Sequence, residues 1–188
     1  MDYKKLLILQ QTFNGNAYTN VGVTIDTQEQ FGVVCQEFPF KYLPESKELP
    51  KRDWYDEDGE DVYVPKDGLR LAAYDLEVKF LYVGSESRMS ANIKDFIDFI
   101  CGRINYTSNS NKVTVNVTQN VMLCVYDEYT KTGRQGMYVK EISNELFAYD
   151  DRNGGYVKQG KKTVYVGDVV AVFKVKFRVT DPVTNITL

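Results

Sequence analysis

The stretch Tyr74-Asp75-Leu76-Glu77-Val78-Lys79-Phe80-Leu81-Tyr82-Val83 decides the fold class of this chain. It forms most of a predicted strand at residues 69–83, in which apolar and charged residues alternate with a period of two. One face would carry Tyr74, Leu76, Val78, Phe80 and Tyr82, and the other Asp75, Glu77 and Lys79. A period of two is typical of a β-strand with one face in a core and the other in water. The stretch therefore predicts a sheet that has one solvated face.

The same kind of pattern extends along most of the chain. Strands or extended apolar runs are expected at residues 6–9, 18–27, 31–40, 113–117, 121–126, 137–142, 145–149, 162–166 and 169–180. In the last of these, the residues expected to face inward are Val169, Ala171, Phe173, Val175, Phe177 and Val179, and those expected to face outward are Lys174, Lys176 and Arg178. Residues 127–136 are expected to form a turn or hairpin tip, and Asn153-Gly154-Gly155 a hairpin turn.

One short amphipathic helix is predicted at about residues 91–101. Five apolar residues with the spacing i, i+3, i+4, i+7 and i+8 would share one stripe of this helix: Ile93, Phe96, Ile97, Ile100 and Cys101. Asn92 is the expected cap at its start, and Gly102 the expected left-handed residue after its end. The stripe has to cover an apolar face, which the neighbouring strands can supply.

Many strands with one helix in the middle of the chain indicate a mainly β protein. We expect an antiparallel β-sandwich or barrel-like sandwich, with the helix laid across one edge or mouth. A chain of 188 residues is long enough for one well-filled core, so residues 1–188 are expected to form a single domain. The 14 Tyr and 10 Phe agree with this class, because aromatic side chains favour half-buried sheet surfaces.

Residues 44–68 interrupt the strand pattern and are predicted to leave the core as a protruding loop or hairpin. They contain three of the five prolines and the dense acidic cluster Asp53, Asp56, Glu57, Asp58, Glu60 and Asp61. Residues 62–64 are apolar and could form the one strand of this excursion. Loops of this length inside compact domains are usually functional or disordered. The excursion is therefore the first candidate for a functional surface.

The composition argues against several classes of function. The net charge is −3 and no stripe of Lys and Arg accumulates, which argues against specific nucleic-acid binding. No apolar run approaches the ~20 residues of a membrane span, and the run at 6–9 is shorter than the roughly 7–15 residues of a secretory signal core. Cys35, Cys101 and Cys124 are odd in number and widely spaced, which favours a reducing compartment over a disulfide framework.

No catalytic set can be assembled from the sequence. The chain contains no histidine, the commonest general base and metal ligand. Neighbouring carboxylates such as Asp127 and Glu128 would point to opposite faces of a strand, so they would not form an acid–base pair in one cleft. The acidic run at 56–61 does not match the EF-hand calcium loop, because that pattern would place Trp54 and Pro65 at positions that need oxygen-bearing side chains. An irregular cation site remains an open alternative. We therefore expect no enzyme and no cofactor.

The order of these segments resembles the N-terminal domain of phage distal tail proteins and the related tail-tube fold. The stretches that carry the resemblance are Lys51-Arg52-Asp53-Trp54 with the acidic turn after it, residues 74–84, the helix from Asn92 to Cys101, residues 136–142 and the closing strand from Val170 to Thr180. Proteins of this kind are β-sandwiches with one helix and a long hairpin or loop, and they assemble as hexameric rings.

The resemblance implies a structural phage or prophage tail protein. Such a protein would self-assemble into a ring around the tail channel and contact other tail or baseplate proteins. It would be made in the bacterial cytoplasm and function in the virion tail, without a membrane or a nucleic acid as its partner.

The candidate interface combines the excursion with the last strand. The acidic excursion of one copy could meet the basic outward face of the next in a head-to-tail contact. The candidate residues are Arg52, Asp53, Trp54, Tyr55, Asp56, Glu57, Asp58, Tyr63, Lys174, Lys176 and Arg178. Two alternatives stay open. Trp54 and nearby tyrosines could form a carbohydrate- or peptide-binding platform, and an enzyme with an unrecognised site would show a pocket with convergent carboxylates.

Overall fold

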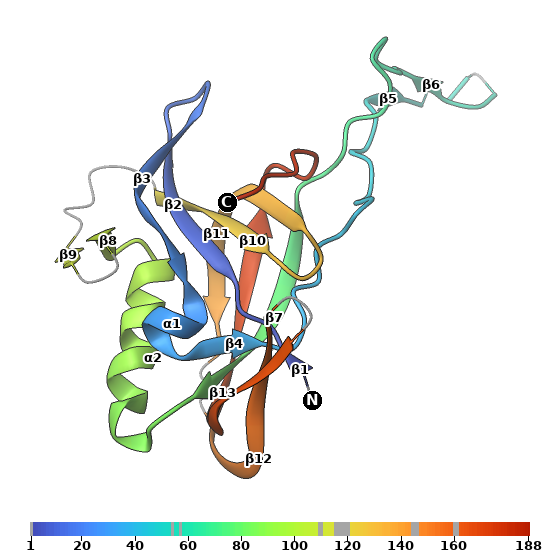
Figure 1. Cartoon of the computed structure of the whole chain (residues 1–188). Helices are drawn as coiled ribbons and strands as arrows, with labels where there is room; N and C mark the ends of the chain where they lie inside the picture. Colours follow the sequence, from blue (N-terminus) through green and yellow to red (C-terminus); the bar gives the residue numbers. More distant parts are fainter. Residues whose placement is uncertain are drawn as a thin grey trace.

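The protein is mainly β, as the sequence predicts. The computed structural model describes residues 2–53, 55–56, 58–108, 111–114, 121–143, 147–159 and 162–188. Its strands form one nine-stranded sheet and two small two-stranded sheets (Figure 1). In chain order the elements are β1 (Asp2–Tyr3), β2 (Leu7–Phe13), β3 (Tyr18–Asp26), α1 (Thr27–Phe31), β4 (Val33–Cys35), β5 (Lys51–Arg52), β6 (Asp61–Val62), β7 (Tyr74–Val83), α2 (Glu86–Ile100), β8 (Ile104–Ser108), β9 (Asn111–Thr114), β10 (Val121–Asp127), β11 (Thr132–Ile142), β12 (Phe147–Gln159) and β13 (Lys162–Val179).

The large sheet curls round and closes on itself. β2, β10, β11, β13, β7 and β4 pair antiparallel, each with the next in this order. Lys4, just before β2, and Cys35, at the end of β4, then exchange two backbone hydrogen bonds of 2.7 and 2.9 Å. This bridge joins the two ends of the series, so these strands form a barrel, and β3 continues along β2 outside it.

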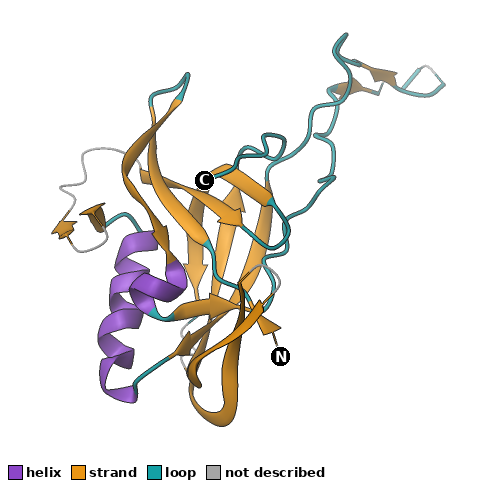
Figure 2. Cartoon of the chain, viewed as in Figure 1, coloured by secondary structure: helices purple, strands orange, loops and turns teal. Residues whose placement is uncertain are grey.

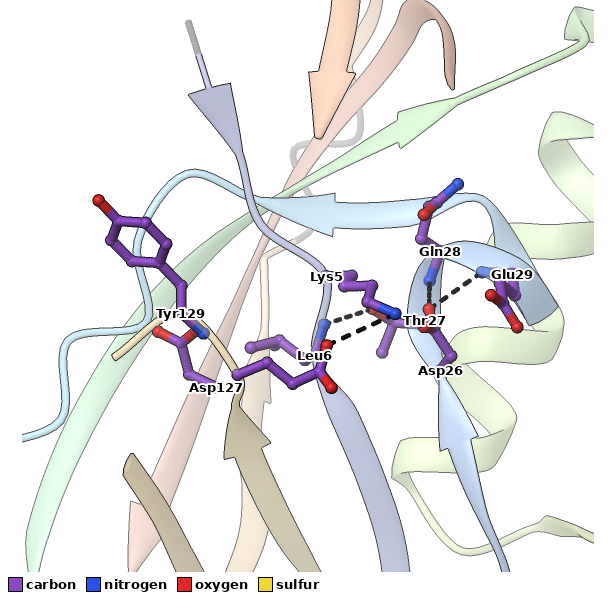
Figure 3. A network of polar contacts seen from close by, with 9 residues as sticks. Lys5, Leu6, Asp26, Thr27, Gln28, Glu29, Asp127 and Tyr129 are labelled. Atoms are coloured by element: carbon purple, nitrogen blue, oxygen red, sulfur yellow. Dashed lines mark hydrogen bonds and ion pairs between the residues drawn. The ribbon is translucent and has the colours of Figure 1, made fainter. Parts of the chain in front are cut away.

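A network of polar contacts next to this closure ties β2 to α1 (Figure 3). Asp26 caps α1 by accepting hydrogen bonds from two backbone N–H groups of its first turn, at 2.9 and 3.1 Å, and it also binds the Lys5 ammonium at 2.6 Å. The Leu6 N–H donates to the Thr27 hydroxyl at 3.1 Å, and the Thr27 N–H donates to the Leu6 carbonyl at 3.0 Å. The chain segment that leads into β2 is therefore held to the start of α1 by both side-chain and backbone contacts.

The strand pattern read from the sequence predicts the buried faces of β7 and β13 correctly. In β7, Tyr74, Leu76, Val78, Phe80 and Tyr82 are all buried; in β13, so are Ala171, Phe173, Val175, Phe177 and Val179. The side chain of Val169, also predicted to face inward, lies outside the described part of the structure. The boundaries were predicted less well. β11 begins at Thr132, inside the stretch expected to be a turn, and β13 is one strand where two were expected. Residues 153–155 lie within β12 and do not form the predicted hairpin turn.

The predicted helix exists, but it is longer than expected. α2 begins at Glu86, about one and a half turns before residue 91, and ends at Ile100. Its cap residue is Ser85, so the assignment of Asn92 as the cap was wrong. Gly102 follows the end in the left-handed conformation, with φ 73°, as predicted. The first turn of α2 was not predicted because Met89 is the one residue there that continues the apolar stripe.

The described residues contain a second helix, α1, which the sequence reading did not predict. This segment was expected to belong to extended runs at 18–27 and 31–40. Its bounds have clear chemical causes, because Asp26 caps the start and Gly32, at φ 67°, ends the helix in a left-handed conformation. Five residues are too few for a helical period to show, so only these two bounding residues could have indicated it.

α2 lies against the barrel (Figure 2). Its aromatic rings pack against those of the barrel strands. The Phe96 ring centroid is 5.1 Å from that of Phe80 in β7 and 5.9 Å from that of Phe173 in β13. Phe99, which the predicted stripe leaves out, is also fully buried. It lies 5.7 Å from Phe31, because α1 packs on that side of α2.

Candidate assembly interface

The predicted excursion is a hairpin arm that projects away from the barrel (Figure 1). We define the arm as residues 36–73, the whole segment between β4 and β7, and the predicted excursion at 44–68 lies within it. Backbone hydrogen bonds join its two legs: the Lys47 N–H donates to the Arg70 carbonyl and the Ala72 N–H to the Glu45 carbonyl, both at 2.7 Å. Further out, β5 pairs with β6. The arm therefore has two short strands, at residues 51–52 and 61–62, where one strand was predicted at residues 62–64.

The arm has almost no core of its own. Between residues 45 and 70, every described residue is exposed except Leu49 and Pro65, which are partly buried. Seven of the twelve large apolar residues that are exposed in the described chain lie in the arm: Tyr42, Leu43, Tyr55, Val62, Tyr63, Val64 and Leu69. A two-stranded ribbon is marginally stable alone in water, and concentrated exposed apolar side chains mark interaction surfaces. The arm therefore has the properties of a segment that packs on a partner.

The arm is also the most acidic part of the chain. Residues 36–73 contain ten Asp and Glu and six Lys and Arg, a net charge of −4, whereas the whole chain carries −3. The acids gather at the tip, where residues 53–61 hold six of them and no Lys or Arg. Two arms brought together would repel each other, so the charge favours contact between an arm and another kind of surface.

The structure places the predicted interface residues of the excursion at the end of the arm. Arg52 lies in β5, and Asp53, Tyr55, Asp56 and Asp58 follow it as exposed residues. Tyr63 is 66% exposed, just beyond β6. Trp54 and Glu57 lie outside the described residues. In the described part of the chain, no group of three or more Cys, Asp or Glu side chains is arranged to hold a metal ion.

The predicted residues of the last strand do face away from the core, but their own molecule already supplies counter-charges. The Lys174 ammonium lies 2.9 Å from a Glu77 carboxylate oxygen. Lys176 is in register with Glu77 of β7 on one side and with Glu141 of β11 on the other. This face is therefore a ladder of alternating charges and not a uniformly basic surface.

Asp75 is the centre of the strongest contacts on this face. Its two carboxylate oxygens accept hydrogen bonds from Lys140 at 2.6 Å and from Arg178 at 2.8 Å. These two hydrogen bonds lower the pKa of Asp75 to about 2. The described residues of this face include five cations and three carboxylates. The cations are Lys79, Lys140, Lys174, Lys176 and Arg178, and the carboxylates are Asp75, Glu77 and Glu141. The face keeps a modest positive charge after internal pairing.

The structure does not bring the two parts of the candidate interface together within one molecule. The arm extends away from the barrel, so its tip lies far from the outer face of β13 (Figure 2). A contact between them requires two copies. Sequence reasoning missed Tyr42 and Leu43, which are 84% and 82% exposed at the base of the arm. They precede the predicted boundary at residue 44, and an apolar pair beside a strand gives no sign that it is exposed.

Comparisons with protein-family models, with curated proteins and with solved structures find no match to this chain. Neither described helix has the length and apolar character needed to cross a membrane.

Proposed function

We propose that this protein is a structural subunit of a phage or prophage tail, of the distal-tail or tail-tube type, which self-assembles into a ring around the tail channel. The arm is the observation that carries this proposal. A closed barrel gives each subunit a rigid body, and a projecting arm with exposed apolar side chains gives it a means to hold the next subunit. The resemblance in the order of segments supplies the tail setting.

The contact is made between the arm of one copy and the body of the next. The arm carries −4, which disfavours pairing of arms, while residues outside it carry 17 Lys and Arg against 16 Asp and Glu. Each subunit gives one arm and receives one, which is a heterologous contact that closes into a ring when the rotation allows. The surplus cations on the outer face of β7, β11 and β13 make that face the first candidate to receive the acidic tip.

The apolar residues of the arm are numerous enough to support such a contact. Full burial of one large apolar side chain contributes roughly 1.5–3 kcal/mol, whereas association costs roughly 4–15 kcal/mol in lost motion. A single buried residue is therefore insufficient, and several have to be covered together. The arm presents Tyr42 and Leu43 near its base and Tyr63 and Val64 further out, so both ends of the arm take part.

The proposal is tested by light scattering coupled to size exclusion over a concentration series, with negative-stain images of large species. We expect rings of about six copies, the number that the resemblance implies. The variant Tyr42→Ser/Leu43→Ser should shift the protein toward monomer while its melting temperature stays close to that of wild type. Phe13→Ser is the matched control, because Phe13 is 41% exposed on the β2–β3 hairpin outside the arm.

A wild-type protein that remains monomeric at high concentration would contradict self-assembly through the arm. In that case a glycan or peptide array with wild type and Trp54→Ala would test the carbohydrate- or peptide-binding alternative.

A further inference from the structure

The base of the arm is built around a buried arginine that has no carboxylate partner among the described residues. Arg134 of β11 is only 3% exposed. Its Nε–H has no hydrogen-bond acceptor in the described structure. Burying a guanidinium without a counter-charge is costly, and such groups can be retained because they specify one arrangement of the chain. The contacts of Arg134 show which arrangement it specifies.

Arg134 lies at the base of the arm, beside its incoming leg and the start of β7. Its guanidinium carbon lies 5.7 Å from the ring centroid of Phe40, on the incoming leg. Its positive charge also lies close to the hydroxyl of Tyr74, the first residue of β7, and it opposes the rise in the pKa of Tyr74 that burial causes. The same hydroxyl accepts a hydrogen bond from the backbone N–H of Lys41 at 3.3 Å. One buried side chain thus lies where the incoming leg of the arm meets the start of β7, the strand into which the outgoing leg runs.

The segment at residues 181–188 holds Arg134 from the other side. The Arg134 Nη1 donates to the Asn185 Oδ1 at 3.2 Å, and the same oxygen accepts the Gly133 N–H at 2.8 Å. The Ile186 N–H donates to the Gly133 carbonyl at 3.2 Å. The fit is tight, because a Cβ added at Gly133 would collide with the carbonyl oxygen of Ile186. Residues 185–186 therefore cover the strand that carries the arginine.

We infer that Arg134 is the positioning residue of the arm, and that residues 181–188 form a latch that keeps the arm at its angle to the barrel. When the latch is displaced, Asn185 withdraws its acceptor, the guanidinium becomes accessible to water, and its hold on Phe40 and Tyr74 weakens. The arm then moves about its base. A neighbouring subunit that contacts residues 181–188 would in this way control the arm that binds the next subunit.

This inference rests on the proposed function for the use of the arm, but the motion can be measured without assembly. Trp54 is the only tryptophan and its sequence position is between the exposed arm residues Asp53 and Tyr55. Time-resolved fluorescence anisotropy of Trp54, at concentrations where the protein is monomeric, reports how freely the arm moves relative to the barrel. Wild type is compared with variants in which melting and circular dichroism confirm a folded barrel.

Three variants should loosen the arm, each by a different route. Arg134→Met removes the guanidinium, Asn185→Ala removes its acceptor, and Gly133→Ala pushes the latch away without altering either side chain. We expect each to raise the amplitude of the fast anisotropy decay at least twofold. Asn185→Asp retains an acceptor oxygen and adds a counter-charge, so it should leave the decay at the wild-type level. Arg178→Met, which removes an arginine from the outer face, is the matched control.

Unchanged anisotropy in folded Asn185→Ala and Gly133→Ala would overturn the inference, whatever happens to Arg134→Met. A similar rise in Arg178→Met would also overturn it, because the effect would then not be specific to the base of the arm. Failure of the proposed function has a different signature: the three variants loosen the arm as expected, yet wild type forms no ring at any concentration. Loss of rings in all three variants, with rings retained in Asn185→Asp, would connect the latch to assembly.

Discussion

Lys4 and Cys35 exchange two backbone hydrogen bonds, of 2.7 and 2.9 Å, although they belong to opposite ends of the series of paired strands. This contact turns a curled sheet into a barrel. It also means that the segment before β2 is part of the structural frame and not a free end. The hydrogen bonds between Leu6 and Thr27 lie directly beside the Lys4–Cys35 bridge. The stability of the closure can therefore be tested by substituting the Thr27 side chain.

Replacing Thr27 by Val should destabilise the barrel by about 1–3 kcal/mol, because the buried Leu6 N–H loses its hydrogen-bond acceptor while the shape of the side chain is kept. Urea denaturation measures the change in the free energy of unfolding. Thr27→Ser is the control, since it keeps the hydroxyl and loses only a methyl group, worth about 0.8 kcal/mol. Equal stability of the Val and Ser variants would show that this hydrogen bond does not support the closure.

Phe96 connects α2 to the barrel, and Phe96→Ala should lower the free energy of unfolding by about 3–5 kcal/mol. Its ring is fully buried against the rings of Phe80 and Phe173, so truncation should leave a cavity in the core. Phe13→Ala, at a residue that is 41% exposed and contacts Tyr18, should cost about 1 kcal/mol or less. Thermal and urea denaturation of both variants give the comparison.

The sequence predicted features that repeat along a segment, such as the alternating faces of β7 and β13 and the apolar stripe of α2. Several residues contribute to each of these patterns, so the pattern is still recognisable when one residue departs from it. The sequence could not predict closure of the barrel, because the Lys4–Cys35 bridge consists of backbone groups that any residue type can supply. It also missed α1, where only Asp26 and Gly32 carried a signal.

The candidate interface was predicted in the same uneven way. Prolines and acids marked the excursion because they break a strand pattern, and the structure has a projecting hairpin there. The role of Arg134 was not visible, since an arginine near a predicted turn is ordinarily exposed and its burial depends on Asn185, far away in the sequence. Likewise, Arg178 looked free in the sequence, because its ion pair with Asp75 depends on the register of β7 with β13.

Asp75 should make the stability of the barrel depend on pH in the acid range. Its folded-state pKa, about 2, lies below the ordinary value of 3.8, so the charged carboxylate stabilises the folded state. This contribution is complete above the unfolded-state pKa and is lost as the pH falls through the folded-state pKa. Asp75→Asn should therefore cost about 1 kcal/mol at neutral pH, as expected for partly exposed ion pairs, and almost nothing once the pH is below ~2.

Urea denaturation of wild type and Asp75→Asn over this pH range checks the prediction. High salt should also reduce the difference at neutral pH, because the contacts are partly exposed to water. Asp53→Asn, at an exposed position on the arm, is the control and should show no comparable change. A difference between wild type and Asp75→Asn that stays constant down to the lowest pH would contradict an ionic origin.

The three thiols should differ in reactivity according to their burial. Cys101 is partly buried, whereas Cys35 and Cys124 are buried. Burial raises the pKa of the Cys124 thiol to about 11, and it also raises the pKa of Cys35, with the Asp127 carboxylate acting in the same direction. Because the thiolate is the reactive form, iodoacetamide should label Cys101 first at neutral pH, with the other two labelled only when the barrel opens.

Mass spectrometry of timed samples locates each label. Cys35 carries additional information, because it takes part in the backbone bridge that closes the barrel. Its labelling should become faster in Thr27→Val than in Thr27→Ser, while labelling of Cys101 should change little. Early labelling of Cys35 in wild type would mean that the closure opens readily in the native state.

Limited proteolysis should cut the arm before the barrel. Lys47, Lys66 and Arg70 are exposed on a ribbon that has almost no core, and such segments are preferred sites of cleavage. The two fragments should then remain together in size exclusion, because β2 and β4 of the first fragment pair with β10 and β7 of the second. Fragments that separate without denaturant would contradict a closed barrel that holds both parts.

The same digestion also reports whether the arm is covered in an assembly. In rings, each arm would lie on the body of a neighbour, so trypsin should cut the arm several times more slowly in ring fractions than in dilute monomer. Tyr42→Ser/Leu43→Ser, which is expected to remain monomeric, should be cut at the rapid rate at every concentration. If rings form and their arms are cut as fast as those of the monomer, the arm is not the contact. The subunits would then have to be held together by the barrel surfaces alone.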